Sequence, residues 1–468
     1  MSRRILSFAA IAAALAAAAH ADVPRVYAIR GARIVTAAGA PIASGTVVLR
    51  DGSIQSAGPD VQPPADARVI DGAGLTVYPG LIDMANTSAV TIPQEEQPRE
   101  LRTSEELERW KRGQILRPQL ETADYVKPDA PDLRKLASAG ITAVLAAPSG
   151  QVVQGRSALI NVAAPEEDPQ IGGVADPRAG LVVLKTPVAL HVQFTPSPRP
   201  GGAYPASLMG SIAFVRQAFL DAQHHQAASD HYGRMRGAGL PRPVRDPALE
   251  AFAPALSGRM PVAFEAGAAR EILRALGIAA EFKLDPIIVG GLESEQVLSD
   301  LKARGARVIY SLNYPSRPRT LAPDADEPLR TLRERAEAPK TPAALEKTGV
   351  LFAFGSAGLR EPKDFVKNAA KAVREGLAPD AAVRALTINA ARVAGVADRL
   401  GSIERGKIAN LVVTEGDLFD EKMKVKHVFI DGRPVNLEEP APARERRDAG
   451  GTEGAVPIHT ASLPSTRP

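Results

Sequence analysis

The sequence contains no cysteine among its 468 residues. This absence excludes disulfides, thiolate zinc sites, a cysteine nucleophile and lipid attachment at an N-terminal cysteine. A strong excess of one charge is also missing, because 57 Lys and Arg against 53 Asp and Glu leave a net charge of +4. Basic and acidic residues are interspersed along the chain. The sequence therefore gives no support to nucleic-acid binding.

Long apolar runs are absent after the first 21 residues. The run from Ile5 to Ala19 follows two arginines and precedes AHA at residues 19–21. This pattern is typical of a secretory signal peptide, and the run is shorter than the roughly 20 residues that span a bilayer. We therefore expect cleavage after residue 21, export to the periplasm or the medium, and a mature protein that is soluble without a membrane span.

Two hydrophobic rhythms divide the rest of the chain. Residues 26–77 read as short alternating strands with turn dipeptides at Asp51-Gly52 and Asp71-Gly72, and a similar pattern returns after residue 400. Between them, continuous apolar strands alternate with amphipathic helices, as in DPIIVGG followed by ESEQVLSDLKARG. Such repeats over about 300 residues predict a (β/α)₈ barrel.

The predicted fold class is thus α/β, a TIM-like barrel with a composite β-sandwich domain built from both chain ends. The segment after about residue 438 lacks apolar periodicity and is rich in Pro, Gly, Ala and charge, which is typical of disorder. The predicted organisation is a signal peptide at 1–21, the sandwich at 22–78 and 399–437, the barrel at 79–398, and a disordered tail at 438–468.

Five motifs in the same order as in a known family span nearly the whole mature chain: VVLRDGSIQSAG, VIDGAGLTVYPGLID, AGITAV, ALTINAARVAG and RLGSIERGKIANLVV. The chain resembles the amidohydrolase superfamily, specifically its imidazolonepropionase-like branch. The resemblance implies one or two divalent metals such as Zn²⁺ at the barrel mouth. It also implies hydrolysis of C–N bonds other than peptide bonds, in cyclic amides or N-acyl and peptide-like compounds, by metal-activated water.

The resemblance also locates five positions that hold the family's metal, and four of them lack a ligand. The two histidines that follow the PGLID motif in the family correspond to Ala85 and Thr87. The later strand ends place Glu265, Gly290 and Ala357 where the family has His, His and Asp. Because a catalytic zinc needs about three protein ligands, we expect no metal, no other cofactor and no catalytic residue of the family's type.

Other polar residues could form a site of a different kind. Asp83, Glu265, His191 and Ser356 are the candidates for a pocket at the barrel mouth, and Lys185 or His191 could lie near a metal-bridging position. The segment PSGQVVQGRSALI is interpreted as a glycine-punctuated loop without the Gly-Lys-Ser/Thr of a phosphate loop. No serine lies in a Gly-x-Ser-x-Gly elbow or shows a His and acid pairing.

A predicted long helix carries a second set of polar groups. His224 and His231 are seven residues apart and share a face, with Asp221 and Asp230 close by. This spacing suits metal ligands on a helix, although a solvated polar face has the same pattern.

Two interpretations of function remain. In the first, the protein is non-catalytic: a pseudoenzyme subunit that assembles with an intact amidohydrolase or with itself, or a barrel that binds a small molecule. In the second, it is an active hydrolase with a rearranged site that uses Glu265 and Asp83. Replacement of His and Asp by small residues removes polar groups that are costly to dehydrate, which favours the first interpretation.

Overall fold

The computed structural model describes residues 26–92, 98, 100–126, 131–150, 152–162, 183–194, 204–235 and 239–437. The predicted signal peptide and the predicted tail lie outside these residues. Within the described ranges, no helix has both the length and the apolar character needed to cross a membrane.

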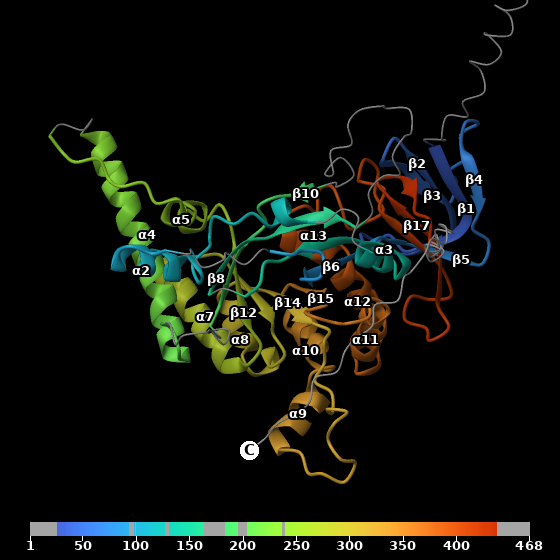
Figure 1. Ribbon diagram of the computed structural model, residues 1–468. Coiled ribbons are helices and arrows are strands. Elements are labelled where there is room, and N and C mark those ends of the chain that lie inside the picture. The colour runs from blue at the N-terminus through green and yellow to red at the C-terminus, as the bar shows by residue number, and fades with distance from the viewer. Residues whose placement is uncertain are drawn as a thin grey trace, which may run out of the picture.

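Strands from both ends of the chain lie in one eight-stranded sheet (Figure 1, blue and red). The N-terminal strand β5 pairs antiparallel with the C-terminal strand β16, with Thr76 opposite Thr414. Alternate residues such as Val47 and Leu49 point into a core shared with Phe429, as the period of two requires. The strands are β1 (Val26–Ile34), β2 (Ile42–Arg50), β3 (Ser53–Gly58), β4 (Arg68–Asp71), β5 (Leu75–Pro79), β16 (Leu411–Glu415), β17 (Lys424–Ile430) and β18 (Arg433–Pro434).

The middle of the chain forms two further sheets. The four-stranded sheet contains β6 (Leu81–Asn86), β7 (Ile141–Ala146), β9 (Ala158–Asn161) and β10 (Val183–Lys185). The six-stranded sheet contains β8 (Val153–Arg156), β11 (Leu190–Gln193), β12 (Val262–Ala266), β13 (Pro286–Gly290), β14 (Arg307–Ser311) and β15 (Phe352–Gly355). Strands β11 to β15 run parallel in chain order.

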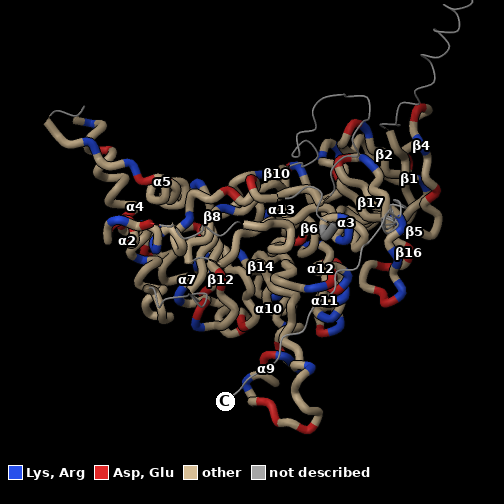
Figure 2. The backbone as a smooth tube through the Cα atoms, viewed as in Figure 1, with Lys and Arg blue, Asp and Glu red and all other residues tan. Residues whose placement is uncertain are grey.

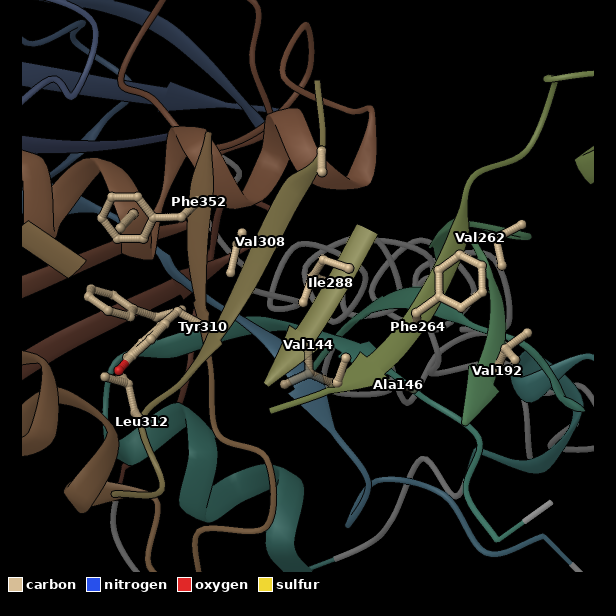
Figure 3. Close-up of a cluster of buried hydrophobic side chains, with 14 of the residues drawn as sticks. Val144, Ala146, Val192, Val262, Phe264, Ile288, Val308, Tyr310, Leu312 and Phe352 are labelled. Atoms are coloured by element: carbon tan, nitrogen blue, oxygen red, sulfur yellow. The ribbon is translucent and has the colours of Figure 1, made fainter. Parts of the chain in front are cut away.

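Both faces of this parallel sheet are buried. Phe264, Ile288 and Val308 point to one side, which Figure 3 shows across neighbouring strands. Ile287 and Ile309 belong to a second cluster on the other side. A sheet covered on both faces needs apolar residues at successive positions, which explains the continuous apolar runs in the sequence.

Several helices pack against these two sheets. The longer ones are α2 (Ser104–Gly113), α3 (Pro131–Ser138), α4 (Leu208–Arg234), α7 (Ala269–Phe282), α9 (Leu329–Glu337), α10 (Thr341–Thr348), α11 (Lys363–Arg374), α12 (Pro379–Leu386) and α13 (Ile388–Ala394). The shorter ones are α5 (Pro247–Glu250), α6 (Ala253–Leu256), α8 (Leu298–Ala303), η1 (Thr122–Tyr125) and η2 (Ser294–Gln296). Figure 2 shows charges of both signs mixed over the surface elements.

The mixed α/β fold is confirmed, but the described strands in the middle of the chain form two separate sheets and do not pair into one closed barrel. The segment predicted as a loop forms β8 and β9, which are antiparallel to β11 and β7 respectively and meet at Ser157. Residues 147–152 are too few for the crossover helix that a parallel neighbour of β7 would need. At the other edge, β15 approaches β6 where the N–H of Ala357 donates to the carbonyl of Ala85 at 3.0 Å.

Candidate functional site

The five positions that the sequence resemblance assigns to metal ligands lie at or just after the carboxyl ends of strands. Ala85 is buried near the end of β6, and Thr87 follows that strand and is exposed. Glu265 and Gly290 are near or at the ends of the paired strands β12 and β13, and Ala357 lies two residues after β15. This edge is where open and closed α/β sheets place their sites.

The side chains at this edge do not fit the metal that the resemblance implies. Glu265 carries the one carboxylate or imidazole among the five positions. In the part of the chain that the structure describes, no three His, Asp or Glu side chains are grouped so as to hold a metal ion. Since a catalytic zinc needs about three protein ligands, we derive no chemical step through a metal.

At Gly290 the backbone conformation, and not only the missing side chain, disfavours a metal-binding histidine. Its φ is +104°, a conformation that residues with a Cβ rarely adopt. The nearest atom to a Cβ built there is the carbonyl oxygen of Ala266 at 3.4 Å, so space is sufficient and the strain lies in φ alone. A histidine at this position would therefore carry a strained backbone.

Gly290→Ala is expected to lower the free energy of unfolding by about 1–3 kcal/mol because of this φ. The matched control is Gly277→Ala, at an exposed position inside α7 where a Cβ meets nothing within 4 Å. The control should gain about 0.5–1 kcal/mol, since Ala has the higher helix propensity. Urea denaturation measures both, and equal effects of the two substitutions would contradict the claim that a Cβ at position 290 is strained by the backbone φ.

Asp83 connects β6 to the segment after β15. Its side chain is fully buried, and its Oδ1 accepts from the N–H of Ser356 at 2.7 Å and of Ala85 at 3.2 Å. Its Oδ2 accepts from the Nδ2 of Asn86 at 3.0 Å. Burial raises the pKa of Asp83, while these donors oppose the shift. The carboxylate thus joins β6 to the segment after β15, although β6 and β15 belong to different sheets.

Ser356 is held in the same contact. Its Oγ donates to the carbonyl of Ala85 at 3.2 Å, and the side chain is buried. The next residue, Ala357, has a φ of +43°, which Asp and Asn tolerate better than Ala does. No histidine is hydrogen-bonded to Ser356 among the described residues, so this arrangement lacks the base that a nucleophilic serine needs.

His191 and Glu265 lie on the neighbouring strands β11 and β12. The imidazole of His191 is 1% exposed, and neither ring nitrogen has a hydrogen-bond partner within the described structure. Desolvation lowers the pKa of His191 to about 4, so the ring is neutral at pH 7. Burial also raises the pKa of Glu265, an effect that the amide of Gln154 partly opposes.

The structure thus groups the four pocket candidates in two places. Asp83 and Ser356 are in contact, whereas His191 and Glu265 belong to β11 and β12. Gln154 was not predicted for the site. It is fully buried on β8, and neither its Oε1 nor its Nε2 has a hydrogen-bond partner of ordinary geometry among the described residues. Reading VVQGRSALI as a buried strand would have singled out this polar residue.

The remaining candidates have other contacts. The Nζ of Lys185 donates to the carbonyl of Ala394 at 2.9 Å. On α4, His224 and His231 are exposed, and Asp221 accepts from the Nε2 of Gln217 at 2.7 Å. The predicted helix is present, and Arg112 lies 3.7 Å from the carboxylate of Asp221.

Comparison with known proteins identifies a family in part of the chain. Residues 286–435 match the amidohydrolase family. No curated protein sequence matches the chain. The structure is similar to a crystal structure of an amidohydrolase from Thermotoga maritima MSB8, with a TM-score of 0.70, 24% identity, and coverage of 88% of this chain and 99% of that one.

Two further solved structures have lower similarity. A Xaa-Pro dipeptidase with methionine bound in its active site gives a TM-score of 0.51 at 16% identity. A prolidase complexed with N-methylphosphonate-L-proline gives 0.52 at 19% identity. Each comparison covers 88% of this chain and 99% of the other. Residues 286–435 thus match the amidohydrolase family, and the chain shares its fold with solved structures of amidohydrolases.

Proposed function

We propose that this chain is an exported, non-catalytic relative of the imidazolonepropionase-like amidohydrolases, and that it has lost their metal site. The observation that carries the proposal has two parts. Glu265 is the one side chain of the five positions that could bind a metal, and Gly290 has a φ of +104°, which disfavours a histidine there. The signal-like pattern of residues 1–21 supports export. The protein would serve as a binding scaffold or as a subunit beside an intact paralogue or a second copy.

Packing between the strands supports a scaffold that does not need a metal for stability. Apolar side chains from both sheets meet there, including Met84, Leu145 and Leu159 from the four-stranded sheet and Ile287 and Ile309 from the six-stranded sheet. Bound structural metals contribute to folding free energy, so a protein without one must hold this region by packing. The cluster supplies that packing.

A hydrolysis assay tests the proposal. The substrates are a cyclic dipeptide, an N-acyl amino acid and, because solved relatives include a dipeptidase and a prolidase, a Xaa-Pro dipeptide. We expect no turnover above the buffer rate, with or without added Zn²⁺. Turnover that a chelator abolishes would contradict the proposal.

The rearranged-site hydrolase has a distinct outcome in the same assay. It predicts turnover that survives the chelator and is lost in Glu265→Gln. The three hydrogen bonds on the Asp83 carboxylate count against its use as a base or nucleophile, since they take up most of its roughly four lone-pair positions. The non-catalytic interpretation is therefore the better supported by the geometry.

A further inference from the structure

A cavity of about 540 Å³ lies beside the strand ends, outside the five positions discussed above. The loops that follow β12 and β13 form one side of it, and α9 forms the other. Figure 1 shows α9 at the lower edge of the molecule, on the excursion between β14 and α10. The volume is in the range of small-molecule sites, and the place is the usual one for α/β folds.

Most charges around this cavity are neutralised within the protein. The Nε of Arg330 lies 2.7 Å from the Oε1 of Glu334, and its Nη2 lies 3.6 Å from the Oε1 of Glu293. Glu337 forms an ion pair with Lys340 at 3.1 Å. Because Arg330 is shared by two carboxylates, these three carboxylates and two cations keep one net negative charge.

Two charged groups of the lining remain unpaired. Arg333 is exposed on α9 and has no hydrogen-bond or ion-pair partner among the described residues. Glu295 is half-buried and accepts from the Oγ1 of Thr341 at 2.8 Å and from the Nε2 of Gln296 at 3.4 Å. No cation pairs with Glu295 in the described structure. The cavity thus offers one free cation and one carboxylate without a counter-charge.

Apolar surface completes the lining. Leu292 is half-buried after β13, and Leu329 is 61% exposed at the start of α9. Both side chains belong to the cavity wall. Apolar walls with a few placed polar groups are the ordinary composition of a small-molecule site.

We propose that this cavity binds a small zwitterion with an apolar substituent, in the class of apolar α-amino acids. The ligand carboxylate pairs with Arg333, its ammonium group pairs with Glu295, and its side chain contacts Leu292 and Leu329. Charge-assisted hydrogen bonds at both poles give selectivity over molecules with a single charge. The proposal goes beyond the loss of hydrolysis and is tested by binding alone, so either claim can fail without the other.

Titration calorimetry on the purified protein provides the test. The probes are L-leucine, N-acetyl-L-leucine, which keeps the negative charge alone, and L-leucinamide, which keeps the positive charge alone. L-leucine should bind at least about tenfold more tightly than either analogue. Equal affinities for all three, or no binding of any at concentrations up to about 10 mM, would overturn the proposal.

Charge variants assign the two poles. Arg333→Gln should weaken L-leucine binding about tenfold and leave L-leucinamide unaffected, and Glu295→Gln should weaken L-leucine but not N-acetyl-L-leucine. The matched control is Arg374→Gln, which removes the same charge from an exposed position on α11. An equal loss in the control would show a general charge effect and would overturn the assignment.

A filling variant tests the place. A Cβ built on Gly267 meets nothing within 4 Å, and this residue lines the cavity, so Gly267→Leu should occupy it and abolish L-leucine binding. Gly277→Leu, on the exposed face of α7, carries the same substitution and should bind normally. Melting temperatures of both variants show whether the fold is intact. Unchanged binding in a folded Gly267→Leu protein would contradict this location.

Discussion

Asp83→Ala is expected to lower the free energy of unfolding by about 3–5 kcal/mol. The substitution removes the acceptor of two backbone N–H groups and one side-chain amide, all at a fully buried position. Each buried donor that loses its partner costs about 1–3 kcal/mol. The loss should be large because the carboxylate joins β6 to the segment after β15, where the two sheets share no ladder. Urea denaturation followed by far-UV circular dichroism measures it.

Two variants serve as controls for Asp83. Asp83→Asn keeps an acceptor for the N–H of Ser356 but turns a donor toward Asn86, so we expect a smaller loss of about 1–2 kcal/mol. Asp71→Ala removes an exposed aspartate whose Oδ1 caps the N–H of Ala73, and about 0.5 kcal/mol should be lost. A loss at Asp83 no larger than that at Asp71 would contradict the joining role.

His191→Leu is expected to make the protein less sensitive to acid. The pKa of His191 is depressed from 6.5 to about 4 by burial, so the folded state disfavours the protonated ring. The stability due to the neutral ring is complete above pH 6.5 and is lost as pH falls through the folded pKa of about 4. This loss amounts to about 3 kcal/mol over that window, and the leucine variant should not show it.

At pH 7 the same substitution should be stabilising by about 1–2 kcal/mol, because two buried nitrogens without partners are removed. His191→Asn separates the two effects. Like the leucine variant, it should not lose stability as the pH falls from 6.5 to about 4, but it should give no gain at pH 7, since asparagine remains polar. Denaturation curves at several values from pH 4 to pH 7 measure both. If His191→Leu lost as much stability as the wild type between pH 6.5 and pH 4, the role given to this residue would be contradicted.

The carboxyl groups of Asp83 and Glu265 act in the opposite direction. Burial raises the pKa of both, so their contribution to stability is present below the ordinary pKa values of 3.8 and 4.5. It is lost as pH rises through the folded values. The comparison of His191 variants with the wild type keeps these two groups constant and isolates the imidazole.

Much of the fold could be predicted from the periods of apolar residues. The continuous runs around Phe264 and Ile288 indicated buried parallel strands, and both faces of those strands are covered in the structure. The segment 153–161 was misinterpreted because glycine and polar residues interrupt its apolar pattern. Its direction could not be predicted either, since the pattern of a buried strand is the same for parallel and antiparallel neighbours.

The site was predicted less completely than the fold. The motifs placed Ala85, Glu265 and Gly290 near strand ends, because the position of a residue along its strand follows from the local sequence pattern. The φ of Gly290 and the contact between Asp83 and Ser356 depend on how distant segments meet, which one sequence does not encode in any local pattern. The cavity beside α9 was missed for the same reason, because its walls come from two separate loops and a helix.

The most direct test of the central claim is the metal content of the protein purified without an affinity tag. Inductively coupled plasma mass spectrometry should find well under one equivalent of Zn, Mn, Fe or Co per chain, and added Zn²⁺ should leave the melting temperature unchanged. This result follows from four positions without ligands and from a backbone conformation at Gly290 that a histidine would adopt only with strain. One equivalent or more of any of these metals, retained through gel filtration, would contradict the proposed loss of the metal site.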